Sequence, residues 1–165
     1  MEVGDLGMQE SEDEVGEFVM KKSEDELKLT DCVCRNLRMT TRVITQYYDK
    51  ALIGTGLKAA QFSLLNSILS KKEGISVNDL AEISLMDQTT ATRNIKILHK
   101  TGFVDVEIED TDSRRKRITV SNLGKRKLAE AMPYWQKAQL NVQKSVGIER
   151  YRSFMEVLQS LRNIE

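Results

Sequence analysis

The sequence predicts a mainly helical fold that contains one two-stranded hairpin. Apolar residues recur at spacings of three and four over most of the chain, as they do on one face of an α-helix. The period changes to two only between residues 103 and 120, where a strand pattern appears twice. Aromatic residues make up 5% of the chain and Pro133 is the one proline, which argues against a β-sandwich or barrel.

The charge of the chain is balanced overall but unevenly distributed. Of the 25 basic and 25 acidic residues, residues 1–26 hold two bases and ten acids, a net charge of −8. The remainder therefore keeps 23 bases and 15 acids, a net charge of +8. We interpret residues 1–26 as an acidic, mobile N-terminal arm. The basic remainder suits a polyanionic partner, although a soluble domain with an acidic tail would have the same charges.

The sequence also indicates where the protein works. No apolar run approaches the roughly 18 to 20 residues that span a bilayer, and the first 26 residues lack the apolar stretch of a secretory signal. We expect a cytoplasmic protein without membrane association.

Two helices are predicted before the middle of the chain. The first covers residues 27–52 and ends at Gly54 and Gly56. It is too long to be buried in a small domain, so we expect it to pack against a second copy of the chain or against distant helices. Residues 27–56 are accordingly assigned to dimerisation. The second helix covers residues 57–69.

The next segment has the pattern of a helix-turn-helix. Ser76 is a predicted N-cap for a short helix over residues 77–83. A tight connector, residues 84–86, leads to Asp87, which is a good N-cap for a helix that runs to about Lys100.

A hairpin and two further helices complete the chain. Residues 103–108 and 116–120 alternate as strands on either side of a polar tip. Ser121 caps a long helix that either stops near Pro133 or continues through it, and a last helix follows Gly147 over residues 148–161. The order predicts a winged helix-turn-helix domain over residues 57–121, with C-terminal dimerisation helices over residues 122–165.

The helix after Asp87 is a candidate recognition helix. Ala91, Ile95 and Leu98 form its apolar face. The opposite face is rich in hydrogen-bonding groups that suit base edges and phosphates, and the helix N-terminus favours phosphate. An ordinary solvated face is the alternative, but the preceding short helix and turn favour DNA. The candidate DNA-binding residues are Gln88, Thr89, Thr90, Thr92, Arg93 and Lys96.

The hairpin tip carries a second candidate DNA contact. Four consecutive cations follow Asp112 there, and arginine fits a narrow, electronegative minor groove. Because strand residues alternate between two faces, not all four can touch DNA. Asp112 is expected to orient one arginine. The candidate wing residues are Asp112, Arg114, Arg115, Lys116 and Arg117.

At these positions the chain resembles the MarR family of regulators. Asp112, Arg114 and the basic strand that leads to Val120-Ser121-Asn122-Leu123-Gly124 are similar to that family's wing and the helix start after it. Leu57-Lys-Ala-Ala-Gln61-Phe62 resembles its second helix, and Leu98-His-Lys-Thr-Gly102-Phe103 the exit from its recognition helix. The likeness covers residues 29–162 in order.

The resemblance implies a function and partners. It implies a homodimer built from the first and the last two helices, which binds a pseudo-palindromic double-stranded operator, usually as a repressor. It also implies release by a small-molecule effector or an oxidant, and carries the family's wing arginine over to Arg114. A winged-helix module that docks proteins without specific DNA binding is the alternative. No cofactor is expected.

Two cysteines and several large side chains have open assignments. Some members of the family place a reactive cysteine near the start of the first helix, so Cys32 and Cys34 are a possible redox sensor, or simply two half-buried residues. Neither they nor the lone His99 make a metal site. Five large side chains are expected either to line an effector pocket or simply to pack in the core: Met39, Met132, Tyr134, Trp135 and Met155. Without a nucleophile elbow or phosphate loop, we do not expect an enzyme.

Overall fold

The computed structural model describes residues 28–109 and 112–164, except for the side chains of residues 109–115. The acidic arm predicted for residues 1–26 lies outside the described residues. The chain divides into two compact units with a boundary between Arg38 and Met39, and each is described by itself.

The first unit contains the start of the first long helix. A 3-10 helix, η1 (Leu29–Asp31), precedes α1 (Val33–Leu52). The backbone at Cys32 between them is extended, with ψ of 114°. The Asn36 side chain donates to the carbonyl oxygens of Thr30 and Cys32, at 2.7 and 3.0 Å. The prediction of one uninterrupted helix from Leu27 is therefore wrong, because a 3-10 turn and an extended residue precede the α-helix.

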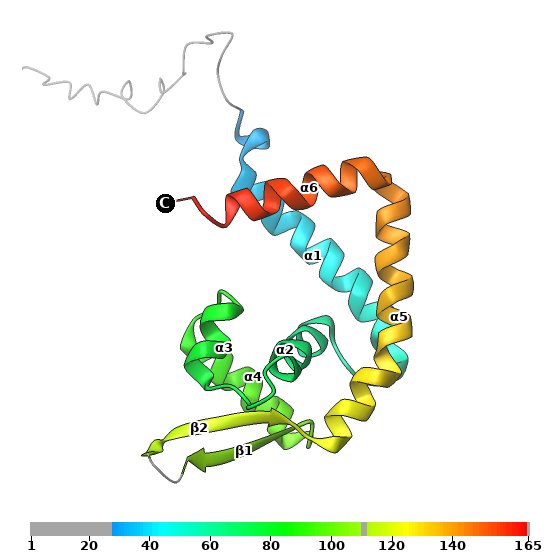
Figure 1. Cartoon of the computed structure of the whole chain (residues 1–165). Coiled ribbons are helices and arrows are strands. Elements are labelled where there is room, and N and C mark those ends of the chain that lie inside the picture. The colour runs from blue at the N-terminus through cyan, green and yellow to red at the C-terminus, as the bar shows by residue number, and fades with distance from the viewer. Residues whose placement is uncertain (1–27, 110–111, 165) are drawn as a thin grey trace, which may run out of the picture. The chain divides into compact units, whose positions relative to one another are not determined.

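The second unit holds the rest of the chain, and its order of elements is the predicted one. After α1 ends come η2 (Ile53–Thr55), α2 (Ala59–Leu69), α3 (Val77–Ile83) and α4 (Gln88–Lys100). The hairpin strands are β1 (Val104–Glu109) and β2 (Asp112–Val120), followed by α5 (Asn122–Val146) and α6 (Ile148–Leu161). Figure 1 shows α2, α3 and α4 grouped beside the hairpin.

The hairpin is antiparallel and is attached to the helices at its base. Val104 pairs with Val120 and Ile108 with Lys116, and the register shifts after Ile108. Ile75, which precedes α3, exchanges two backbone hydrogen bonds with Ile118, at 3.0 and 2.9 Å. The second strand begins earlier than the predicted residue 116.

One apolar core holds the helices and the hairpin together. It is built by the C-terminal end of α1, by α2 to α4, by the two strands and by the first half of α5. Its most completely buried large side chains are Leu52, Leu65, Ile68, Leu80, Leu98, Val104 and Ile118. Burying one such side chain contributes roughly 1.5 to 3 kcal/mol. These contacts fix which face of α4 points outward.

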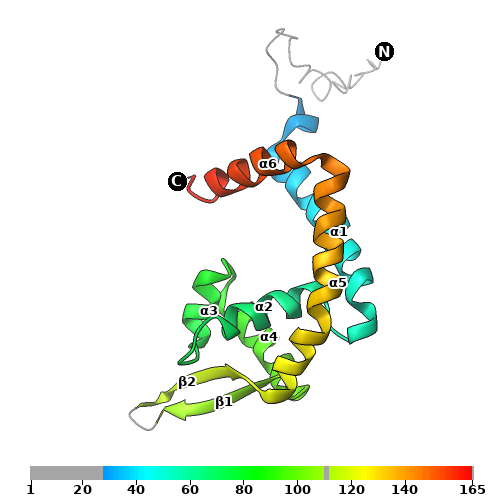
Figure 2. The same ribbon diagram turned by 45° about the vertical axis from the view of Figure 1, so that its right-hand side comes forward.

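The C-terminal helices have a different character. α5 continues through Pro133, and Gly147, with φ of +84°, separates it from α6, which leaves the far end of α5 in Figure 2. Among the described residues, no helix is both long and apolar enough to cross a bilayer. Large apolar side chains are exposed along α5, α6 and the second-unit part of α1: Met39, Val43, Ile44, Tyr47, Tyr134, Leu140, Val146, Ile148, Phe154, Met155 and Val157.

This architecture confirms the predicted fold class, a mainly helical winged helix-turn-helix with long flanking helices.

Candidate nucleic-acid interface

Two side-chain caps set the directions of α3 and α4. The Ser76 hydroxyl accepts the N–H of Asp79 at 3.1 Å. The Asp87 carboxylate accepts the N–H of Thr90 at 2.8 Å and its hydroxyl at 2.6 Å. Hydrogen bonds from Thr90 lower the pKa of the Asp87 carboxyl, and the bond from the Thr90 hydroxyl has a larger effect than the bond from its N–H. The cap therefore stays ionised in moderately acidic solution. The N-caps predicted at Ser76 and Asp87 are therefore both present.

Between the two helices the chain makes a tight turn. Leu85 has a left-handed backbone, with φ of 49°, and is 75% exposed. The N–H of Met86 then donates to the carbonyl of Ala81 at 3.0 Å. This turn leaves the N-terminus of α4 beside α3.

The outer face of α4 gathers most of the predicted DNA-binding residues. Ala91, Ile95 and Leu98 are buried in the core, as expected from their spacing. The opposite side chains line a shallow hollow of about 550 Å³: Gln88, Thr89, Thr92, Arg93, Lys96 and Ile97. Five of the six predicted recognition-helix residues therefore share one surface, and the exposed Arg93 and Lys96 give it positive charge.

Thr90 does not join that surface. Its hydroxyl is bonded to the Asp87 cap, and its carbonyl accepts the Asn94 side-chain amide at 2.9 Å. Asn94 lines a separate hollow together with Leu85 and Met86. The polar side chain of Asn94 is thus accommodated away from the outer face of α4.

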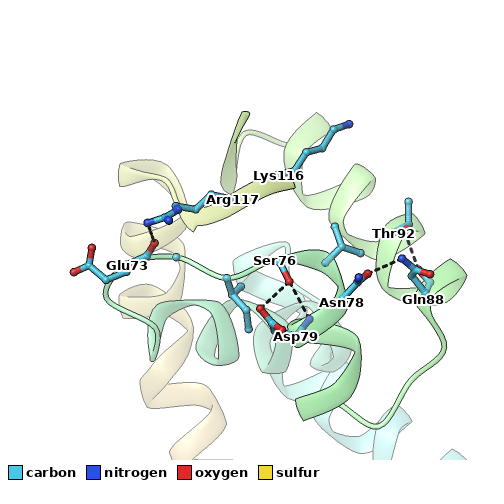
Figure 3. Close-up of a pocket in the computed structure, with 11 residues that line it drawn as sticks. Glu73, Ser76, Asn78, Asp79, Gln88, Thr92, Lys116 and Arg117 are labelled. Carbon is cyan, nitrogen blue, oxygen red and sulfur yellow. Dashed lines mark hydrogen bonds between the residues drawn. The ribbon is translucent and has the colours of Figure 1, made fainter. Parts of the chain in front are cut away.

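A groove of about 600 Å³ lies between the helix-turn-helix and the second wing strand (Figure 3). Lys116 and Arg117 stand on the wing side, and Asn78, Gln88 and Thr92 on the helix side. Because Gln88 and Thr92 line both hollows, the groove continues onto the outer face of α4.

The groove also contains acidic side chains. Asp79, in the first turn of α3, accepts the Ser76 hydroxyl at 2.7 Å, and Glu73 lies on the same side of the groove as Arg117. Lys116 is exposed. The surface that runs from Lys116 over Gln88 to Arg93 and Lys96 is therefore polar, with cations at both ends, and suits a hydrated anionic polymer.

The two described wing residues differ in their surroundings. Arg117 is half-buried and donates to the Glu73 carbonyl oxygen at 2.9 Å, which ties the wing to the turn before α3. Gly74 permits this approach, since it has φ of +80° and a Cβ there would lie 2.7 Å from Arg117 Cγ. The side chains of Asp112, Arg114 and Arg115 lie outside the described residues.

Asn78 is not among the residues predicted from the sequence. Its Oδ1 accepts the Gln88 side-chain amide at 2.5 Å, across the two helices (Figure 3). Asn78 is the second residue of α3. A helix-turn-helix pattern places the first turn of α3 near the start of α4. That spacing was the available signal.

A further hollow, of about 450 Å³, has a mostly apolar lining. Phe62 and Trp135 stack at 5.8 Å between ring centroids, and Met132 lies beside them. Tyr48 lines the hollow too and donates its hydroxyl to Gln139, whose amide nitrogen donates to the Tyr151 hydroxyl at 2.7 Å. Burial, with smaller contributions from Tyr151 and Tyr47, raises the pKa of Tyr48.

Two of the five residues suggested for an effector pocket meet at this hollow. Met132 and Trp135 both line it and also pack against the core, so the two readings of these residues are compatible. Met39, Tyr134 and Met155 are exposed elsewhere.

The two cysteines belong to the first unit. Cys32 follows η1 with an extended backbone and is half-buried, whereas Cys34 is exposed in the first turn of α1. They are both free thiols, and they do not share a helix as the sequence suggested. Among the described residues, no group of three or more His, Cys, Asp or Glu side chains could hold a metal ion.

Comparison with known proteins assigns the chain to a family. The MarR family model matches residues 55–115, which cover α2 to the start of β2. No protein of curated function matches the sequence significantly. The transcriptional regulator MosR from M. tuberculosis, solved in complex with DNA, is 31% identical, with 81% of this chain and 99% of that chain covered and a TM-score of 0.67.

Two solved structures with lower identity share the fold. A MarR-family transcriptional regulator from Rhodococcus sp. RHA1 is 21% identical, with 82% of this chain and 96% of that chain covered and a TM-score of 0.71. CouR from Rhodococcus jostii RHA1, solved with p-coumaroyl-CoA, is 21% identical, with coverage of 85% and 98% and a TM-score of 0.69. The chain belongs to the MarR family of transcriptional regulators, which are not enzymes.

Proposed function

We propose that the protein is a cytoplasmic homodimer that binds a specific double-stranded operator and represses transcription, and that a small ligand or an oxidant releases it. The observation that carries the proposal is the continuous polar surface of the outer face of α4 and the adjoining wing groove. The 31% identical MosR has been solved in complex with DNA, which supports this use of the surface.

The dimer is supported by the apolar residues that a single chain leaves exposed. Val43 on α1 is 66% exposed, Phe154 on α6 is 46% exposed and Val157 is 53% exposed. Monomeric soluble proteins rarely expose extended apolar patches, so we assign these helices to contacts with a second copy. Sedimentation at micromolar concentration should give twice the chain mass, and a stable monomer would contradict the assignment.

The ligand site that we propose is the hollow beside Trp135. Its lining of aromatic rings and a thioether, with the Tyr48 hydroxyl as a polar group, has the character of a site for a small, largely apolar molecule. CouR, which has the same fold, has been solved with p-coumaroyl-CoA. A ligand in this hollow would change the affinity for DNA only if it bound the DNA-bound and the DNA-free conformations of the protein with different affinities.

For oxidant release, the proposed sensors are Cys32 and Cys34. Cys34 is exposed, which gives an oxidant access to its sulfur. Cys34→Ser should abolish loss of DNA binding on peroxide treatment, with Cys32→Ser tested in parallel. Release that persists in both variants would remove the cysteines from the mechanism.

The main experiment is binding of the purified full chain to duplexes from the DNA upstream of its own gene, measured by fluorescence anisotropy at several salt concentrations. We expect one segment to bind more tightly than competitor DNA, with log affinity falling by about 0.9 per log unit of salt for each phosphate contact. Arg114→Ala should weaken binding while the dimer persists. Absence of any salt-dependent duplex binding would refute the proposal and favour a protein-docking module.

A further inference from the structure

We propose that Asn78 is a positioning residue that holds the Gln88 carboxamide in the orientation that reads an adenine in the major groove. The inference rests on the proposed DNA-binding function and assigns a base and a specificity device to it. Asn78 lies on α3 and Gln88 is the first residue of α4, so the pair joins the two helices of the motif.

The geometry of the pair fixes the Gln88 side chain. Its Nε2 donates to Asn78 Oδ1 at 2.5 Å, while both residues are exposed and both line the groove below Lys116. An exposed glutamine otherwise samples several rotamers, and ordering one of them on binding costs conformational entropy. The bond to Asn78 removes much of that cost before DNA arrives.

The bond also leaves the useful edge of the amide free. A carboxamide nitrogen carries two hydrogens, and one of them is donated to Asn78. The other hydrogen and Oε1 remain, as one donor and one acceptor. Adenine presents an acceptor, N7, beside a donor, N6–H, so the two groups match. Guanine presents two acceptors at the same edge and cannot satisfy Oε1.

The neighbouring threonine cannot substitute for this contact. The Thr92 hydroxyl donates to the Gln88 backbone carbonyl at 2.8 Å, so its hydrogen is already used within the helix. Thr92 is half-buried and offers only a methyl group and an oxygen lone pair to a base. Gln88 is therefore the groove side chain of α4 that presents a donor and an acceptor together.

The test selects duplexes from a random-sequence pool with the full-length protein and compares base preferences among variants. In the wild type, one position should favour A·T over G·C, and Gln88→Ala should lower that ratio by at least about fivefold, the low end for one two-pronged contact. Asn78→Ala should lower the same ratio, and should have no further effect on it in the Gln88→Ala protein.

Asn78→Asp distinguishes the direction of the hydrogen bond. A carboxylate can only accept, so it should keep the Gln88 amide in place and preserve the ratio, although its charge lowers affinity for all duplexes alike. A ratio that collapses in Asn78→Asp overturns the proposal, because Asn78 would then be the donor. Asn94→Ala is the matched control, since that amide bonds to the Thr90 carbonyl and should leave every base preference unchanged.

Failure of the inference and failure of the proposed function give different results. A wild-type protein that selects no sequence refutes both. A wild-type protein with a clear preference that survives Asn78→Ala refutes only the role of Asn78.

Discussion

The wing groove and the hollow beside Trp135 are similar in size and opposite in chemistry. The groove, of about 600 Å³, is lined by amides, hydroxyls and charged groups on α3, α4 and β2. The hollow, of about 450 Å³, is lined mainly by aromatic rings and small side chains on α1, α2 and α5. α2 separates the two, because its residues line the hollow while its core side chains contact α3 and β2.

This contrast shows that one small fold can carry two surfaces of opposite chemistry. Polar groups in the groove are held by local bonds, such as the Ser76 cap of α3 and the bond between Gln88 and Asn78, so they present fixed donors and acceptors to a hydrated partner. The hollow depends on ring packing instead, with one chain of hydrogen bonds at Tyr48. Changes that act on one site and spare the other can therefore be designed.

The largest effect on stability is expected from Gly74→Ala, at the point where the turn before α3 contacts the second wing strand. The added Cβ would lie 3.0 Å from the Ile118 carbonyl oxygen and 2.9 Å from Thr119 Cγ2, at φ of +80°. Overpacking and backbone strain should together lower the free energy of unfolding by about 3 kcal/mol. Urea unfolding at equal protein concentration measures it.

Gly56→Ala is the matched control for that change. Gly56 has φ of +75° but nothing within 4 Å of the added Cβ. The Gly56→Ala change should lower the free energy of unfolding only by the cost of a left-handed backbone at alanine, about 1 kcal/mol. Equal losses in the two variants would mean that the wing does not press on Gly74.

The next effect is on DNA affinity alone. Arg93→Ala combined with Lys96→Ala removes two exposed cations from the outer face of α4. Affinity should fall roughly 10- to 100-fold at about 0.1 M salt, with a smaller salt slope and unchanged urea unfolding. The control combines Lys50→Ala on α1 with Lys144→Ala on α5, which changes the net charge of the chain by the same amount. An equal loss of DNA affinity in this control would indicate a nonspecific charge effect.

A smaller effect is expected at the hollow. Tyr48→Phe removes the donor to Gln139 and should lower the free energy of unfolding by about 1 kcal/mol. The salt slope of DNA binding should not change. Tyr47→Phe is the control, since the Tyr47 hydroxyl makes no hydrogen bond within the described part of the chain, and it should be close to neutral.

The smallest effect is a pH dependence at the α4 cap. Hydrogen bonds from Thr90 lower the folded-state pKa of Asp87, so its contribution is present above the ordinary aspartate pKa of about 3.9 and is lost as pH falls through the lowered value. Asp87→Asn keeps an N-cap without the charge. Its unfolding free energy should decline less than that of the wild type below about pH 4, and parallel declines would remove Asp87 from the acid response.

Local signals in the sequence predicted the elements that local contacts stabilise. α3 and α6 have the predicted bounds, and α4 starts after its predicted cap. α2 was predicted to start at Leu57 but starts at Ala59, where Gln61 accepts the N–H of Lys58 at 2.9 Å and the Asp49 carboxylate of α1 accepts the N–H of Ala59 at 2.7 Å. A cap supplied by another helix leaves no trace in the local pattern.

The same distinction applies to the candidate site. Helical periodicity placed Gln88, Arg93 and Lys96 on one face correctly, since a helix fixes which side chains share a side. It could not separate Thr90, whose hydroxyl is bound by its own cap. Asn78 was missed because its contact with Gln88 depends on how two helices cross.

The paired amides of Ile75 and Ile118 have a consequence for how the molecule folds. They join segments far apart in the chain, one before α3 and the other within β2. The hairpin can pair with itself early, but its base cannot be completed until the preceding helices have assembled. Hydrogen exchange at these two amides should therefore report a single cooperative opening event, in which the base of the wing and the helix-turn-helix come apart together.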